Sequence, residues 1–272
     1  MRVRLSASGN IIILLGALIL GGCIHSPTAP GRSGVSLALR WVSAAVAGVA
    51  PVDSLTLLAL DSGGAVLLPE APIPIIPGIP PTFSDTLELP AGAGRRITVR
   101  AFSHGDEYYR GSVSDVTVQF GQSTTVEVGL RNSLGIKLTS PPSGAAQADT
   151  VRIPVVLSGN VSLRGLQLDV EFDAGALQFA DVTRVLAGTD GFDAREIRPG
   201  TARILFYGST PSQLLNTAGD STRACVLKFL RCPNGSCPLP GVTHLSLTGV
   251  QAVSRHGLVQ PADTAGLTLA VP

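Results

Sequence analysis

The sequence has few charged and few aromatic side chains. Charged residues make up 14% of its 272 residues, and the aromatic residues are one Trp, three Tyr and eight Phe. Proteins that bind nucleic acid usually carry a basic stripe along the backbone path, or aromatic rings on which bases stack. The formal net charge here is +1 and the sequence contains no basic run. We therefore expect no nucleic-acid partner.

The motifs of the common enzyme classes are also missing. The sequence contains no Gly-x-Ser-x-Gly elbow, no Gly-x-x-x-x-Gly-Lys phosphate loop, no His-Glu-x-x-His zinc motif and no Asp-x-Asp-x-Asp-Gly calcium loop. The nearest approach to an acid–base cluster runs from Ser103 through His104 to Glu107, and its composition is typical of a polar hairpin turn. The sequence therefore predicts a non-enzymatic protein with no catalytic residues, cofactor or metal site.

The N-terminus has the charge and hydropathy of an export signal. Arg2 and Arg4 precede an apolar stretch at residues 11–20, which is too short to span a bilayer as a mature helix. The stretch ends in Leu20-Gly-Gly-Cys23, where small residues let the backbone enter a narrow peptidase site and the thiol offers an atom for acylation. A plain secretory signal and a short membrane helix are the alternatives.

This arrangement resembles the lipobox of bacterial lipoproteins. The resemblance implies that residues 1–22 are a signal peptide and that Cys23 begins the mature chain, carrying a diacylglyceryl thioether and an acylated amine. Several acyl chains together give stable anchoring to membrane lipid. Residues 23–34 are rich in Ser, Thr, Pro and Gly and read as a lipidated tether. Ile24 stands where an Asp signals inner-membrane retention, which implies the outer membrane of a bacterial cell envelope.

Beyond the tether, short alternating runs of Val, Thr and Leu are separated by many of the 31 Gly and 20 Pro residues. Alternation with a period of two predicts half-buried strands, and no long stretch shows helical spacing. Removing 22 residues from 272 leaves 250, enough for two domains with separate cores. We expect an all-β chain with two β-sandwich domains, at residues 35–132 and 133–272.

The first domain is predicted to contain strands that start near Val35, Leu55, Asp85, Ile97, Val113 and Thr124. Residues 69–81 are rich in proline, which cannot donate to a sheet ladder, so they are expected to form a loop or an edge extension. Turns are expected at residues 92–94 and 121–122. The segments from Thr86, Ile97 and Gly121 resemble the prealbumin-like or immunoglobulin-like modules of bacterial surface proteins.

The second domain has the clearer strand pattern. Between Gly165 and Asp173, apolar side chains alternate with Gln167, Asp169 and Glu171, which should therefore share the solvated face of one strand. Further strands are expected from Val151, Leu177, Thr201, Ala224, His244 and Leu267. Sandwich domains usually bind through one sheet face or through the loops at one end. Gln167, Asp169 and Glu171 are therefore the candidate binding face.

The order of these segments, from Asp149 through Gly165 and Pro199 to Cys225, resembles the cohesin domain. The resemblance implies a β-sandwich that binds a dockerin-like protein module. Related sandwiches, including carbohydrate-binding modules and fibronectin-like domains, are the alternatives. Two features depart from the family: an insertion at residues 232–240 and a long connection at residues 188–200.

Four cysteines are present, of which Cys23 is assigned to the anchor. Cys225 alternates with core positions and is expected to be a buried thiol. Cys232 and Cys237 bracket an Asn-Gly turn, and in an oxidising compartment they are predicted to form a disulfide. The alternative is a metal site that adds His244, although the spacing lacks a second pair of ligands.

Three functions are consistent with these features. The first is a membrane-anchored scaffold whose cohesin-like domain binds a protein partner. The second is a carbohydrate-binding surface module, which is disfavoured because so few aromatic rings are present to stack on sugars. The third is a structural spacer in an envelope complex.

Overall fold

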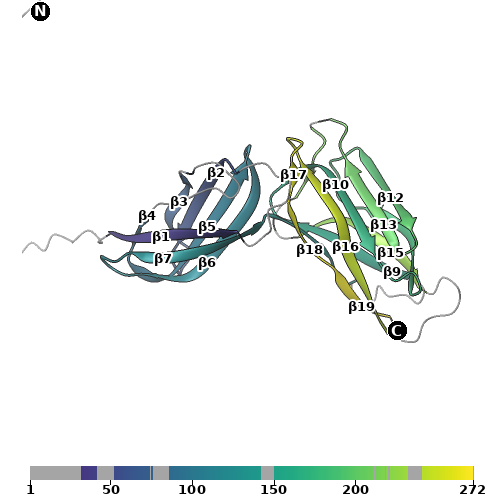
Figure 1. Ribbon diagram of the computed structural model, residues 1–272, viewed down its shortest axis with the longest axis horizontal. Coiled ribbons are helices and arrows are strands. Elements are labelled where there is room, and N and C mark those ends of the chain that lie inside the picture. Colours follow the sequence, from purple (N-terminus) through teal and green to yellow (C-terminus); the bar gives the residue numbers. More distant parts are fainter. Residues whose placement is uncertain are drawn as a thin grey trace, which may run out of the picture.

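The computed structural model describes residues 32–41, 52–73, 75, 86–141, 150–210, 212–217, 219, 221–231 and 241–271. All the regular elements in these ranges are β-strands, so the predicted all-β sandwich class is confirmed. The buried apolar side chains form two clusters, one drawn from Val35 to Leu130 and the other from Leu134 to Leu269. Figure 1 shows the two sandwiches side by side along the long axis of the molecule. None of the described residues belongs to a helix long and apolar enough to cross a membrane.

The first sandwich is built from seven strands. They are β1 (Arg32–Trp41), β2 (Ser54–Leu60), β3 (Val66–Ile73), β4 (Thr86–Pro90), β5 (Gly92–Ser103), β6 (Asp106–Val118) and β7 (Thr124–Asn132). Their order is β3-β2-β5-β6-β7-β1-β4, and β1 runs parallel to β7. β6 and β7 pair only at Tyr109–Asn132 and Arg110–Arg131, so the sheet divides there into two layers around the core.

One expectation for this domain holds in the structure and two change. The proline-rich stretch forms the edge strand β3 as far as Ile73, which agrees with an edge extension; residues 74 and 76–81 lie outside the described ranges. The turn expected at residues 92–94 is instead the irregular start of β5, and the chain bends before it, at Ala91. His104 does lie in a turn, but Asp106 and Glu107 begin β6 and are buried.

The second sandwich packs two sheets face to face. Its strands are β8 (Leu134–Leu138), β9 (Thr150–Ser158), β10 (Ser162–Glu171), β11 (Leu177–Arg184), β12 (Gly191–Arg198), β13 (Thr201–Tyr207), β14 (Leu215–Asn216), β15 (Thr222–Arg231), β16 (Gly241–Ser254), β17 (Val259–Gln260), β18 (Ala262–Ala265) and β19 (Leu267–Val271). One sheet has the order β11-β15-β9-β8-β18. The other has the order β12-β13-β10-β16-β17, with β14 on β10 and β19 on β16.

The core of this sandwich follows from alternation along the strands. Leu166, Leu168 and Val170 of β10 are buried at 1% exposure or less, and they face the apolar side chains of β9 and β15. The aromatic rings of Phe172 and Phe229 meet edge to face, with centroids 5.0 Å apart. The inward faces of the two sheets together remove apolar area from water, and this burial holds the sheets together.

Two sequence expectations for this sandwich have opposite outcomes. Cys225 is a free thiol in the core, as predicted, and burial raises its pKa to about 12. The long connection expected at residues 188–200 is wrong, because β12 occupies most of it as the edge strand beside β13. Cys23, Cys232 and Cys237 lie outside the described residues, so the lipidation and disulfide predictions remain predictions.

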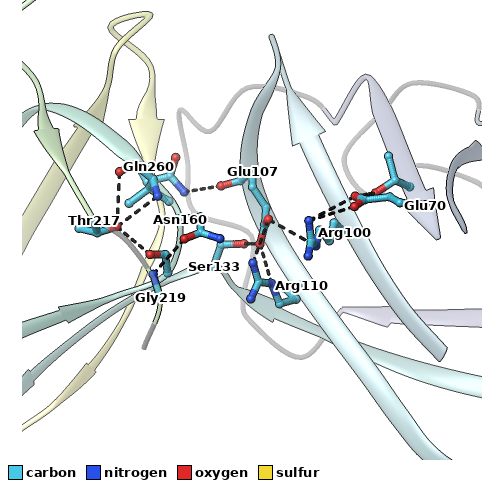
Figure 2. A network of polar contacts seen from close by, with 12 residues as sticks. Glu70, Arg100, Glu107, Arg110, Ser133, Asn160, Thr217, Gly219 and Gln260 are labelled. Carbon is cyan, nitrogen blue, oxygen red and sulfur yellow. Dashed lines mark hydrogen bonds and ion pairs between the residues drawn. The ribbon is translucent and has the colours of Figure 1, made fainter. Parts of the chain in front are cut away.

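The β5–β6 turn of the first sandwich is joined to the β16–β17 hairpin of the second by hydrogen bonds and ion pairs. The side-chain amide of Gln260, which is 3% exposed, donates to the backbone oxygen of Glu107 at 3.2 Å. The Glu107 carboxylate accepts bonds from Arg110 at 2.8 Å and from the Ser133 hydroxyl at 2.9 Å. Figure 2 shows this chain of contacts from Gln260 through Glu107 to Arg100 and Glu70. The junction therefore contains a buried polar network that connects the two sandwiches.

A second set of contacts closes the same junction. The Arg255 guanidinium lies 2.7 Å from the Asp106 carboxylate, and the Tyr108 hydroxyl donates to that of Ser254 at 3.4 Å. Burial raises the pKa of the Asp106 carboxyl, although Arg255 and His256 oppose the shift. Removing the Asp106 carboxylate from water costs free energy, which its pairing with the more exposed Arg255 offsets. These side chains therefore fix how the two sandwiches dock.

We expect Gln260→Ala to lower the free energy of unfolding by about 1–3 kcal/mol, since it leaves the buried Glu107 carbonyl without its donor. Urea denaturation of the variant checks this. Gln178→Ala, at an exposed position of β11, is the matched control and should change stability by less than about 0.5 kcal/mol. Equal effects from the two substitutions would show that the Gln260 contact contributes nothing.

Candidate functional site

The candidate face is the outer side of the sheet β12-β13-β10-β16, and we call it the β10–β13 face. Gln167, Asp169 and Glu171 do lie on it, because Leu166, Leu168 and Val170 alternate with them into the core. Its other outward side chains come from the neighbouring strands and are Asp193, Arg195, Arg203, Leu205, Tyr207, Ser246, Thr248 and Gln251. Polar groups therefore surround a short apolar row, Leu205 and Tyr207, on the inner strand β13.

An ion pair between Asp169 and Arg203 occupies the middle of the face. Arg203 stands directly opposite Asp169 in the β10–β13 register, and its Nε and an Nη each donate to a carboxylate oxygen at 2.7 Å. The Asp169 side chain is 12% exposed, so it is covered rather than solvated as the alternating pattern predicted. This hydrogen bonding raises the pKa of Arg203. A bidentate fork of this kind fixes both side chains, so Asp169 positions Arg203 and is not itself available to a partner.

A β-bulge at Gly249 makes room for this pair. The register of β10 with β16 shifts between Gln167 and Asp169, and Gly249 in the bulge has a φ of +54°. A Cβ at this position would lie 2.6 Å from Oδ2 of Asp169. The Gln167 amide in turn donates to the Gly249 carbonyl at 3.4 Å. The bulge therefore holds both β10 side chains in place, which is a common use of bulges near binding sites.

The remaining charges of the face are also paired within it. Arg198 reaches across β13 to Glu171 at 3.3 Å, and Arg195 lies 4.0 Å from Asp193. These pairs are exposed, so each adds little to stability. The ion pairs instead determine the charge of the surface, because every acid named on the face has an arginine beside it. The three acids and three arginines named on the face therefore balance in charge.

Tyr207 supplies the exposed apolar surface at one end of the face. Its ring lies over Gly191 on the neighbouring edge strand, where an added Cβ would be 2.1 Å from the ring. The side chain is nevertheless 47% exposed. A ring held against a glycine has lost much of its rotational freedom before any partner binds. Tyr207 is therefore a preorganised aromatic contact, of the type that anchors protein interfaces.

The loop beyond Tyr207 is ordered by Asp190. The Ser209 backbone N–H donates to Asp190 at 2.9 Å and the Ser209 hydroxyl donates to its other oxygen, which lowers the pKa of Asp190. The Gln213 side chain accepts from the Thr210 N–H at 3.0 Å. These bonds connect two loops at the end of the face where Tyr207 lies. Asp190 therefore organises this pair of loops.

The sequence identified only part of this face. A strand was expected from Thr201, but nothing local showed which strand Arg203, Leu205 and Tyr207 would lie beside. Of the described residues, no three His, Cys, Asp or Glu side chains form a group that could hold a metal ion. His104 and His256 meet at the domain junction, with ring centroids 6.1 Å apart, and not on this face.

No protein-family model and no curated protein matches the sequence. Solved cohesin structures are similar to part of the chain. The sixth cohesin of scaffoldin B from Acetivibrio cellulolyticus, in complex with a dockerin, has 16% identity and a TM-score of 0.43, covering 52% of this chain and 100% of that one. A type I cohesin–dockerin complex from Clostridium thermocellum has 14% identity and a TM-score of 0.42, covering 50% and 92%. A non-cellulosomal cohesin from Archaeoglobus fulgidus has 17% identity and a TM-score of 0.40, covering 52% and 91%.

Gly249→Ala tests whether the bulge organises the face. We expect it to lower the free energy of unfolding by about 2–4 kcal/mol, because the left-handed backbone disfavours Ala and the new methyl group displaces Asp169. Gly257→Ala is the matched control: its φ is +79° and no atom lies within 4 Å of the added Cβ, so only the backbone term of about 1–2 kcal/mol applies. Urea denaturation compares the two, and equal losses would contradict the proposed clash with Asp169.

Proposed function

We propose that this chain is a lipid-anchored, non-enzymatic binding protein of the bacterial envelope whose β10–β13 face binds a protein partner. The observation that carries the proposal is the outward apolar row of the partly buried Leu205 and the exposed Tyr207, on a sheet face whose acids are paired with arginines. A partner that covers such a face gains apolar burial without leaving an unpaired charge in the interface. Unpaired buried charges are among the costliest defects of an interface, so this arrangement favours association.

A dockerin-like module is the partner we propose to test first. The motivation is the order of strand segments in residues 149–229, which resembles the cohesin family, together with a face that fits a protein. Within this proposal Tyr207 and Leu205 form the centre of the interface. Gln167, Glu171 and Arg203 form its polar rim, and Asp169 acts through Arg203.

A carbohydrate partner is the second candidate, and the face fits it less well. Modules that bind polysaccharide by stacking need several exposed rings in one plane. Among the side chains whose exposure the structure describes, Tyr207 and Phe120 are the aromatic ones that are largely exposed, and they belong to different sandwiches. One ring on the β10–β13 face gives a sugar chain no extended platform.

The first sandwich would act as a spacer between the membrane and this face. β1 begins at Arg32, nine residues after the proposed lipidated Cys23, and nine extended residues span at most about 30 Å. The first sandwich would therefore lie close to the bilayer. The junction through Glu107 and Gln260 would hold the second sandwich, with its binding face, at a set orientation.

Tyr207→Ala combined with Leu205→Ser should weaken binding of a dockerin module to the full chain by at least about tenfold, because aromatic anchors dominate interface energetics. Isothermal titration calorimetry measures the change. Phe120→Ala removes an aromatic side chain that is 71% exposed on the first sandwich, and it should leave the affinity unchanged. If no dockerin module binds the unaltered chain, the proposed partner class is wrong. If binding survives the double substitution, the face is wrong.

Cys23→Ser should abolish labelling by radioactive palmitate in a bacterial host and release the chain from the membrane fraction, since no thiol remains to be acylated. Cys225→Ala is the control, because that thiol is buried and its loss should leave labelling and fractionation as they were. Mature chain that begins elsewhere and carries no acyl groups would disprove the anchor. Mass spectrometry of the mature N-terminus decides between these outcomes.

A further inference from the structure

The opposite sheet of the second sandwich carries a different charge arrangement. Across its strands β9, β15 and β11, Arg152 lies in register with Lys228, and Lys228 lies in register with Asp181. Val226 and Thr183 form the next cross-strand pair. These five side chains surround a shallow pocket of about 180 Å³ on the outer surface of the sheet. The pocket belongs to neither the β10–β13 face nor the domain junction.

Two positive charges meet across this register, and the Asp181 carboxylate, although it is the cross-strand neighbour of Lys228, forms no ion pair with either of them. Like charges directly opposite each other destabilise a sheet. Among the described residues, no carboxylate lies within ion-pair distance of Arg152 or Lys228, whereas the acids of the β10–β13 face form ion pairs with arginines. Arg152 is exposed and Lys228 partly so, which leaves both able to reach a ligand. An anion bound between Arg152 and Lys228 would relieve their repulsion.

A β-bulge in β11 adds a hydrogen-bonding carboxylate to the pocket. The register of β11 with β15 shifts between Phe179 and Asp181, which turns Asp181 to the outer surface beside Lys228. One of its carboxylate oxygens accepts the Val182 N–H at 2.7 Å, so the carboxylate is fixed at the rim. Asp181 can accept hydrogen bonds from ligand hydroxyls, and Thr183 can donate or accept them. Val226 adds a small apolar surface between the polar groups.

We propose that this pocket binds an acidic monosaccharide unit, a sugar that carries a carboxylate or a phosphate. Arg152 and Lys228 bind the oxyanion, Arg152 through its planar fork. Asp181 and Thr183 bind hydroxyl groups of the ring, and Val226 contacts its C–H face. A bare phosphate would use the cations but would be repelled by Asp181. The combination therefore selects an anion that also carries hydroxyl donors.

Nuclear magnetic resonance titration of the chain at low salt tests the proposal with glucuronate, glucose 6-phosphate, inorganic phosphate and glucose. Millimolar glucuronate or glucose 6-phosphate should shift the amide signals of Thr183, Val226 and Lys228, and glucose should not. Arg152→Gln and Lys228→Gln should each weaken binding by about fivefold or more, because each removes a charge-assisted bond. Asp181→Asn should strengthen binding of inorganic phosphate and reduce the preference for glucose 6-phosphate.

Lys137→Gln is the matched control. Lys137 is the only other lysine of the chain and is exposed on β8 of the same sheet, outside the pocket, so its loss should change the affinity by less than about twofold. An equal loss from Lys137→Gln and Lys228→Gln would reduce the effect to general surface charge and overturn the site. Equal affinity for inorganic phosphate and the sugar acids would overturn the saccharide assignment. The pocket and the β10–β13 face lie on different sheets, so failure of one proposal leaves the other standing.

Discussion

The second sandwich depends on one constraint, the burial of alternate side chains along β10. This strand pairs with β13 on one side and with β16 on the other, and Leu166, Leu168 and Val170 fix which way it faces. A shift of one residue would move all three into water and bring charged side chains into the core. The outward positions of Gln167, Asp169 and Glu171 are therefore a consequence of core packing. Whatever the β10–β13 face binds, its side chains are placed by the apolar layer beneath them.

The same dependence explains what sequence alone could predict. Most strands of the second sandwich were predictable because each alternates between a buried and a solvated side over a few residues. β12 was missed because it is an edge strand in which all but its first few side chains are exposed or nearly so, and its sequence resembles a polar loop. Asp106 and Glu107 were placed in a solvated turn for a related reason. Their burial comes from the other sandwich, which contributes Gln260 from a position 153 residues further along the chain.

The features of the β10–β13 face also divide into those that the sequence could predict and those that it could not. That Asp169 lies opposite Arg203 depends on the β10–β13 register, which no local pattern contains. The pairing changes the role of Asp169 from an exposed acid to a residue that positions a guanidinium. Gly249 was likewise an ordinary glycine in the sequence, and only the register shift in β16 shows that a side chain there would meet Asp169. Sequence patterns therefore gave the direction of each side chain, and the register gave its partner.

The outer surfaces of the two sheets of this sandwich differ in how their charges are arranged. On the β10–β13 face, arginines neutralise the acids within the surface, so a partner can cover it without breaking a charge–solvent interaction that it cannot replace. On the β9–β15 side, Arg152 and Lys228 lie opposite each other, and Asp181 lies beside Lys228 without forming an ion pair. A large partner suits the first surface because apolar area drives its association. A small charged ligand suits the second, because a shallow pocket of about 180 Å³ offers little area and its affinity must come from charge. The two proposed ligands would therefore use different sheets of the same sandwich.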